Sequence, residues 1–158
     1  MTTTSYAIAL GSNRPGRHGG PREAIRAALA RIEGIYAVSP ILTTAPVGPS
    51  IRAFANAAAL VRSERSPPEM LAMLKAIERD FGRRRGQRWG ARVIDLDIIL
   101  WTGGAWRSRG LLVPHAAYAS RAFVLHPLAS IAADWRDPRG GRRIRHLRHG
   151  VDRRRPRP

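Results

Sequence analysis

The chain has 158 residues, enough for one domain with a substantial core, and 44% of them are hydrophobic. It contains no cysteine, which excludes disulfides, a thiolate nucleophile and a cysteine-based zinc site. No apolar run approaches the roughly 20 residues of a membrane span, and the first residues lack the regions of a secretory signal, so we expect a cytoplasmic protein.

The formal net charge of +17 is unevenly distributed. Residues 136–158 carry ten arginines against two aspartates, so almost half of the excess lies in this short C-terminal stretch. We expect the stretch to be a solvated, partly disordered tail. The alternative is weak, salt-sensitive binding to nucleic acid or another polyanion.

The first part of the chain predicts a strand, a helix and two further strands. Pro21 can occupy the first turn of the helix, and Gly34 is a suitable residue to end it. The predicted elements are a strand at 6–10, a helix over 21–34, and strands at 35–44 and 54–62.

The second part begins with a helix and a buried strand. Ser66 and Glu69 form a capping box with proline in the first helical turn, and Gly82 ends the helix. After the strand at 93–100 the chain predicts a turn at Gly103-Gly104, a short extended segment at 111–114 and a helix around 120–131.

The element order β-α-β-β-α-β is that of the ferredoxin-like fold. We therefore expect an α+β domain with a four-stranded antiparallel sheet, two helices on one face, and a C-terminal extension.

The most informative stretch places Asp95 and Asp97 in an otherwise apolar strand. Residues two apart in a strand point to the same face, about 7 Å apart. Two carboxylates there require a compensating cation, and a hard divalent ion with phosphate ligands suits them. The alternative is a solvent-exposed strand face on which the pair meets Arg92.

Five arginines immediately precede this strand, and guanidinium groups bind phosphate in a bidentate manner. Carboxylates for a metal beside arginines for phosphate are the chemistry of nucleotide phosphoryl transfer. These arginines are Arg83, Arg84, Arg85, Arg88 and Arg92.

These motifs together resemble the 6-hydroxymethyl-7,8-dihydropterin pyrophosphokinase family of folate synthesis. They occur in family order and span roughly residues 6–135. The matching segments are LGSN at 10–13, TAPVGP at 44–49, FAN at 54–56, IE at 77–78, GRRRGQRWGARVIDLDIIL at 82–100, VPH at 113–115 and RAFVLHPLASIA at 121–132.

The resemblance implies one pyrophosphokinase domain over residues 1–135. Its implied reaction transfers pyrophosphate from ATP to the hydroxymethyl group of 6-hydroxymethyl-7,8-dihydropterin, releasing AMP, for tetrahydrofolate biosynthesis. The implied partners are these two small molecules, with neither nucleic acid nor membrane, and the implied state is a monomer.

The resemblance also implies residue roles on the phosphate side. Asp95 and Asp97 hold two Mg²⁺ ions that bridge the ATP phosphates and the hydroxymethyl oxygen. The catalytic set adds to this pair Arg83, Arg92, His115 and Arg121. The ATP contacts are Glu78, Arg83, Arg85, Trp89, Arg92, Ile98, His115 and Arg121, of which Arg83, Arg85 and Trp89 lie in a mobile catalytic loop.

On the pterin side, Phe54 and Phe123 are implied to sandwich the ring by stacking. Hydrogen bonds from Asn56 and from the backbone of Thr44 and Val47 read its polar edge. Trp89 and Asp95 complete the implied pterin contacts.

Single residues also have simpler interpretations. Without the resemblance, Phe54 and Phe123 read as core aromatics, His115 as a structural histidine, and Arg84 and Arg88 as solvated loop charges. The chain departs from the family pattern at a few positions without losing a metal ligand or stacking ring; these are Ala45, Gly86, Gly110 and Ala116.

Two other functions compete with the pyrophosphokinase. A ferredoxin-like RNA-binding module fits the basic charge but requires stacking aromatics in a K/R-G-F/Y-G/A-F pattern, which the chain lacks. A catalytically weakened binder of pterin or nucleotide is the other alternative.

Overall fold

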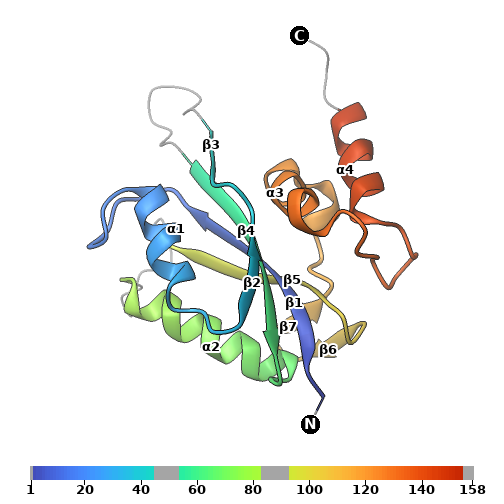
Figure 1. Ribbon diagram of the computed structural model, residues 1–158, viewed down its shortest axis with the longest axis horizontal. Helices are drawn as coiled ribbons and strands as arrows, with labels where there is room; N and C mark the ends of the chain where they lie inside the picture. Colours follow the sequence, from blue (N-terminus) through green and yellow to red (C-terminus); the bar gives the residue numbers. More distant parts are fainter. Residues whose placement is uncertain (1, 45–53, 83–92, 155–158) are drawn as a thin grey trace.

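The computed structural model describes residues 2–44, 54–82 and 93–154. Its elements follow the predicted β-α-β-β-α-β order and continue into a C-terminal extension (Figure 1). They are β1 (Thr4–Ser12), α1 (Pro21–Leu29), β2 (Ile35–Val38), β3 (Leu42–Thr44), β4 (Phe54–Ser63), α2 (Pro67–Asp80), β5 (Asp95–Trp101), β6 (Trp106–Ser108), β7 (Leu111–Val113), the 3₁₀ turn η1 (Tyr118–Ser120), α3 (Ala122–Ala132) and α4 (Ile144–Arg153).

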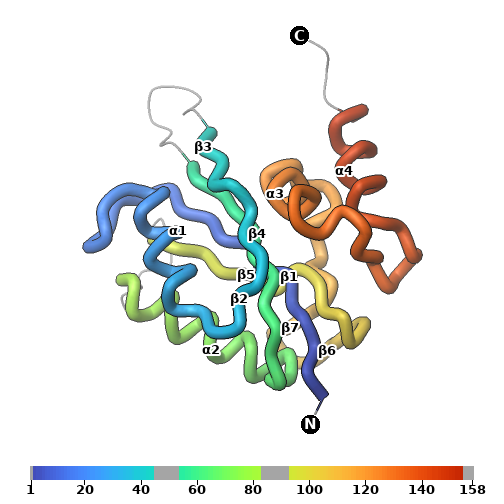
Figure 2. Tube along the Cα trace, in the orientation of Figure 1, coloured from blue at the N-terminus to red at the C-terminus, as the bar shows by residue number. Residues whose placement is uncertain are grey.

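The main sheet has the strand order β2-β4-β1-β5, with β3 also paired to β4. All of its pairings are antiparallel, so β1 lies between two strands that are distant in the sequence (Figure 2). This arrangement confirms the predicted ferredoxin-like fold.

The sheet is covered on both faces. Helices α1 and α2 pack on one face, over a core that includes Tyr6, Ile8 and Leu10 of β1. Helix α3 packs on the other face, where it meets Ala7, Leu60 and other buried residues, and α4 packs on α3 (Figure 1). The prediction of two helices on one face therefore describes the core, and α3, with α4 packed on it, adds a third layer.

The capping box that opens α2 is confirmed. The backbone N–H of Ser66 donates to Glu69 Oε1 at 3.0 Å, and the N–H of Glu69 donates to Ser66 Oγ at 3.4 Å. Helix α1 ends at Leu29, before Gly34. Gly34 serves a different purpose: a Cβ there would lie 2.1 Å from the carbonyl oxygen of Arg62, and its φ is +85°. Only glycine allows this close approach to β4.

The single strand predicted at 35–44 is divided into β2 and β3. Pro40 has no N–H for the ladder, and Ser39 replaces part of the pairing. The Ser39 N–H donates to the Ala58 carbonyl at 2.9 Å, and Ser39 Oγ accepts from the Ala58 N–H at 2.8 Å.

The C-terminal stretch differs from the solvated tail that its charge predicts. Residues 144–153 form α4, in which Ile144 is fully buried and Leu147 and Val151 pack against the same core. These three residues recur at helical spacing and give one apolar stripe within the arginine-rich sequence. The many charges occupy the rest of the helix surface.

Candidate active site

A cavity of about 550 Å³ opens on the sheet face that α3 partly covers. Its lining combines backbone and side chains from β1, β4 and β5 with the segment that leads into α3. The lining residues are Ala9, Leu10, Gly11, Ser12, Asn13, Thr44, Phe54, Asn56, Asp95, Asp97, Ile99, His115, Arg121, Ala122, Phe123 and Val124.

The middle of the cavity floor is made by small residues of β1. Gly11 lies opposite Asn56 of β4 and Asp95 of β5, and Ala9 lies opposite Asp97. A Cβ on Gly11 would come within 3.2 Å of Asn56 Oδ1. Because neither β1 residue fills the space, the polar groups of both neighbouring strands face a common hollow.

Asp95 and Asp97 both line this hollow and are half-buried. The intervening Leu96 is fully buried among the residues under α1 and α2. The alternation confirms that the two carboxylates share one face, as the strand period requires.

Ser12 has a tethering role that the sequence did not reveal. Its buried side chain donates a 2.5 Å hydrogen bond to the carbonyl of Val93, immediately before β5. The bond connects the end of β1 to the start of β5, the strand that contains Asp95 and Asp97. The LGSN motif pointed to this place without indicating the contact.

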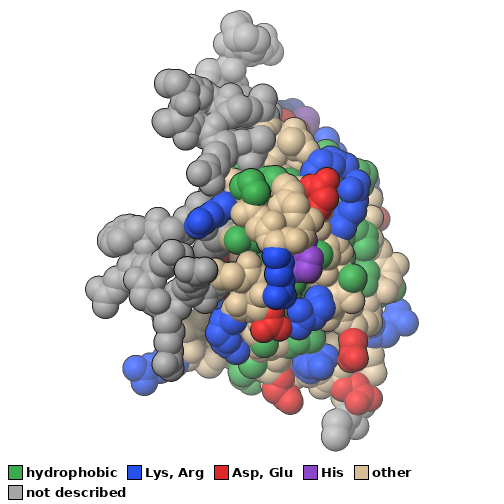
Figure 3. All heavy atoms as spheres, turned by 90° about the vertical axis from the view of Figure 1, so that its left-hand side faces the viewer, with side chains coloured by type: hydrophobic (Ala, Val, Ile, Leu, Met, Phe, Trp, Pro, Cys, Tyr) green, Lys and Arg blue, Asp and Glu red, His purple; other side chains and the backbone are tan. Residues whose placement is uncertain are grey.

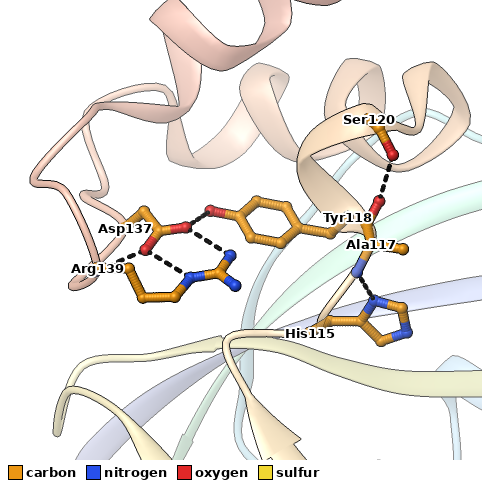
Figure 4. A network of polar contacts seen from close by, with 6 residues as sticks. All are labelled: His115, Ala117, Tyr118, Ser120, Asp137 and Arg139. Carbon is orange, nitrogen blue, oxygen red and sulfur yellow. Dashed lines mark hydrogen bonds and ion pairs between the residues drawn. The ribbon is translucent and has the colours of Figure 1, made fainter.

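His115 is held at the cavity by its backbone and its ring. Its N–H donates to the Ile99 carbonyl at 3.0 Å, and its Nδ1 accepts from the Ala117 N–H at 3.2 Å (Figure 4). Since Nδ1 is the acceptor, the proton of the neutral ring is on Nε2. The Nε2–H group is then available as a donor.

Arg121 and Phe123 lie at the start of α3. Arg121 is the residue before the helix and is exposed, and its guanidinium carbon is 5.8 Å from the centre of the Phe123 ring. A helix N-terminus carries partial positive charge, which adds to the charge of this arginine. This edge of the cavity suits an anion.

The two predicted stacking rings are not core residues. Phe54 is 41% exposed and Phe123 is 50% exposed, and both line the cavity. Thr44 pairs with Phe54 across β3 and β4 and also reaches the lining. An apolar ring left this exposed next to polar groups suits a flat ligand better than it suits the core.

Two residues with implied ATP contacts do not line this cavity. Ile98 points to the opposite sheet face from Asp97, into the core under α1 and α2, and Ile99 takes its place in the lining. Glu78 of α2 is buried, with Lys75 Nζ at 2.8 Å. Nucleotide contacts for both stay predictions.

Other predicted site residues lie outside the described residues. They are Val47, Arg83, Arg85, Trp89 and Arg92. Eight predicted site residues are thus brought together at one cavity: Thr44, Phe54, Asn56, Asp95, Asp97, His115, Arg121 and Phe123.

Fold and cavity define the class: an α+β protein of ferredoxin-like topology with two carboxylates, a basic edge and two exposed aromatic rings around one binding cavity. The family model for 7,8-dihydro-6-hydroxymethylpterin-pyrophosphokinase matches residues 7–133, and the chain belongs to this family.

Curated relatives agree with this assignment. The chain is 42% identical over 146 residues to the 2-amino-4-hydroxy-6-hydroxymethyldihydropteridine pyrophosphokinase of Pseudomonas aeruginosa, covering 89% of this chain and 85% of that one. It is 40% identical over 134 residues to the protein of the same name from Bacillus subtilis, covering 83% and 79%. With the Synechocystis protein of that name it shares 44% identity over 105 residues, covering 66% of this chain and 54% of that one.

Among solved structures, the chain resembles the wild-type HPPK-DHPS protein of Plasmodium falciparum. The TM-score is 0.75 at 14% identity, over 97% of this chain and 42% of that one. This likeness supports the fold, and the chain spans less than half of that longer protein.

Proposed function

We propose that the protein transfers pyrophosphate from ATP to the hydroxymethyl group of 6-hydroxymethyl-7,8-dihydropterin, giving AMP and the dihydropterin diphosphate for tetrahydrofolate biosynthesis. The observation that carries this proposal is that Asp95 and Asp97 line the same cavity as the exposed rings of Phe54 and Phe123. A phosphate-side metal site and a stacking site for a flat heterocycle are what this reaction requires. Membership of the pyrophosphokinase family supports the same reaction.

The donor set fits Mg²⁺. Asp95 and Asp97 supply hard carboxylate oxygens from one strand face. Within residues 2–44, 54–82 and 93–154, no group of three or more His, Cys, Asp or Glu side chains forms a closed metal cage. Mg²⁺ normally takes one or two carboxylates and completes its shell with water and phosphate oxygens. When bound, two Mg²⁺ ions would offset the phosphate charge and help the attacking hydroxymethyl group to lose its proton.

The basic edge would bind the ATP phosphates. His115 offers its Nε2–H, and Arg121 offers a guanidinium beside the N-terminus of α3. Both groups donate hydrogen bonds where negative charge builds up on the transferred phosphates. Arg83, Arg85, Trp89 and Arg92, which precede β5 in the sequence and lie outside the described residues, would complete the ATP site.

The pterin would lie between Phe54 and Phe123, over the small residues of the floor. Stacking alone does not select one planar ring over another, so the polar edge must also be read. Asn56, with the backbone of Thr44 and Val47, would supply those hydrogen bonds.

In the reaction, the hydroxymethyl oxygen attacks the β-phosphorus of ATP, forms a new P–O bond and releases its proton to water. The bond between this phosphorus and the oxygen bridging to the α-phosphate breaks, and AMP leaves with that electron pair. The residues named above hold both substrates in line, which provides most of the catalysis in phosphoryl transfer.

The protein would act as a cytoplasmic monomer on these two small molecules. In the described part of the chain, no helix is both long enough and apolar enough to span a membrane.

The RNA-binding alternative is disfavoured by the packing. RNA-binding modules of this fold stack bases on the open sheet face, whereas α3 covers much of that face here and α4 packs on α3. On the side shown in Figure 3, Lys and Arg side chains lie in separate groups with Asp and Glu among them.

The test is AMP formation from ATP and Mg²⁺, with and without 6-hydroxymethyl-7,8-dihydropterin. Pterin-dependent AMP release that EDTA abolishes is the expected result. Binding of pterin or ATP without AMP would instead indicate a weakened binder. Absence of both, with salt-dependent RNA binding, would favour the basic module.

A further inference from the structure

The C-terminal extension, residues 134–153, is linked to the segment 115–121 of the candidate active site by a partly buried polar network (Figure 4). The hydroxyl of Tyr118 donates a 2.6 Å hydrogen bond to Asp137 Oδ2. The guanidinium of Arg139 donates to both oxygens of the same carboxylate, at 3.2 Å from Nε and 3.0 Å from Nη2. The backbone N–H of Arg139 adds a 2.7 Å bond to Asp137 Oδ1.

The network is charged, and it is buried at Tyr118 and Asp137 while the Arg139 side chain is 47% exposed. Tyr118 is fully buried and Asp137 is 7% exposed. Burial, followed by the hydrogen bond and charge of Asp137, raises the pKa of Tyr118, so the hydroxyl keeps its proton and stays a donor. Burial alone would raise the pKa of Asp137, but bonds from Arg139 and Tyr118 outweigh it and the pKa lies below its ordinary value. Bonds to an ionised acceptor of this kind are stronger than neutral ones.

Asp137 is itself fixed by the backbone of the extension. Its N–H donates to the Arg142 carbonyl at 2.9 Å, and its carbonyl accepts from Gly141 N–H at 2.8 Å. The next pair, Ile144 N–H to the Trp135 carbonyl at 2.9 Å, connects this turn to α4. The carboxylate is therefore a fixed point to which Tyr118 is attached.

Tyr118 lies between two residues of the candidate active site. The Ala117 N–H bonds the ring of His115, and the Tyr118 carbonyl accepts from the Arg121 N–H at 3.1 Å. Of the seven residues from 115 to 121, Tyr118 alone is buried. A 3₁₀ turn of three residues has poor hydrogen-bond geometry of its own. The orientation of this segment thus depends on how its one buried side chain is held.

We propose that Asp137, with Arg139, is a positioning residue that acts through Tyr118 to hold His115 and Arg121 at the phosphate side of the cavity. The inference rests on the proposed pyrophosphoryl transfer, in which those two residues meet ATP. It assigns a role in the reaction to the extension beyond residue 133, where the family match ends. The arginine-rich stretch thereby becomes part of the working enzyme.

Tyr118→Phe is the most specific variant, because it removes one hydroxyl and leaves Asp137 paired with Arg139. Asp137→Asn is the second variant and keeps an acceptor for Tyr118 while removing the charge. Asp152→Asn is the matched control: Asp152 accepts from His126 at 2.7 Å and ties α4 to α3, away from the 115–121 segment. Thermal unfolding of all three shows whether each remains folded.

Two readouts separate positioning from stability. The first is the ¹⁵N chemical shifts of the His115 ring in the substrate-free protein, assigned with His115→Gln. The second is kcat and KM for both substrates in pterin-dependent AMP release. We expect Tyr118→Phe and Asp137→Asn to move the His115 signals and to lower kcat roughly tenfold, with a smaller change in pterin KM. Asp152→Asn should match the wild type in both readouts.

Each outcome bears on one claim. Wild-type His115 shifts and kcat in folded Tyr118→Phe would overturn the positioning role, as would equal losses in Asp152→Asn. If wild-type protein releases no AMP but Tyr118→Phe still moves the His115 signals, the proposed function fails and the structural coupling stands. If AMP is released and His115 does not respond, the positioning role fails alone.

Discussion

Replacing Gly11 by alanine should weaken pterin binding without destabilising the protein. Gly11 lies in the cavity floor between Asn56 and Asp95 on neighbouring strands. Its added Cβ would lie 3.2 Å from Asn56 Oδ1, closer than ordinary van der Waals contact, so the amide must shift by a few tenths of an ångström. The backbone of Gly11 is in a region open to any residue, so alanine adds no strain there.

The size of the effect follows from these contacts. A displaced Asn56 amide loses much of one hydrogen bond to the pterin, worth about 0.5–1.5 kcal/mol. The methyl group also occupies space over which the ring would lie. We expect a total loss of about 1.4–2.7 kcal/mol, which is about 10- to 100-fold in pterin affinity. Alanine in a strand interior is favoured over glycine by about 0.5–1 kcal/mol, so the unfolding temperature should hold or rise.

The assay is calorimetric titration of 6-hydroxymethyl-7,8-dihydropterin into each protein, combined with thermal unfolding. Gly140→Ala is the control, because a Cβ on Gly140 meets nothing within 4 Å. It should bind pterin like the wild type. Unchanged pterin affinity in stable Gly11→Ala would refute the placement of the ring over the floor. A large fall in unfolding temperature would show that the added Cβ disrupts the sheet itself.

Four further changes test other parts of the molecule. Asp97→Asn should lower pterin-dependent AMP release by about 100-fold or more with an unchanged circular dichroism spectrum, because the proposed metal site loses a charge; wild-type-like turnover would contradict that site. Arg83→Ala should lower kcat more than pterin affinity, and a change in pterin binding alone would exclude a phosphate contact in the transition state. The pKa of Asp137 is lower in the folded protein than the unfolded value of about 3.9, so the ionised carboxylate stabilises the fold at neutral pH. The wild type should therefore unfold at a higher temperature than Asp137→Asn at neutral pH, and this difference should disappear as the pH falls through the folded pKa. Gly150→Ala, inside α4 with open space around it, should raise the free energy of unfolding in urea by up to about 1 kcal/mol, and a decrease would show that the added Cβ does meet a neighbour.

Local periodicity was sufficient to predict the fold and the acidic part of the site. The two-residue period of β5 placed Asp95 and Asp97 on one face, and the Ser66–Glu69 pattern marked the start of α2. The same period also separates Ile98 from Ile99: Asp95, Asp97 and Ile99 share the cavity face, and Ile98 faces α1 and α2. Strand alternation therefore accounts for the orientation of Ile98, and its contact with the nucleotide stays a prediction.

Long-range polar contacts carried no comparable signal. Ser12 bonds a carbonyl 81 residues away, and Tyr118 bonds a carboxylate 19 residues away in a stretch dominated by arginine. The sequence separation of such partners does not predict their contact, because the contact depends on how distant parts of the chain pack together. Charge density also concealed the apolar stripe of Ile144, Leu147 and Val151, from which α4 could have been predicted.

One face of the sheet explains why the site and the C-terminal layer occur together. Toward one end of β1, β4 and β5 this face carries Ala7, Leu60 and Leu100, which must be removed from water and are covered by α3, on which α4 packs. Toward the other end the same strands carry Gly11, Asn56 and Asp95, which leave a polar hollow. Helix α3 begins at the boundary between the two, so the packing that buries the apolar end also places Arg121 and Phe123 at the rim of the cavity. Weakening the docking of α3 should therefore impair phosphate binding before it unfolds the sheet.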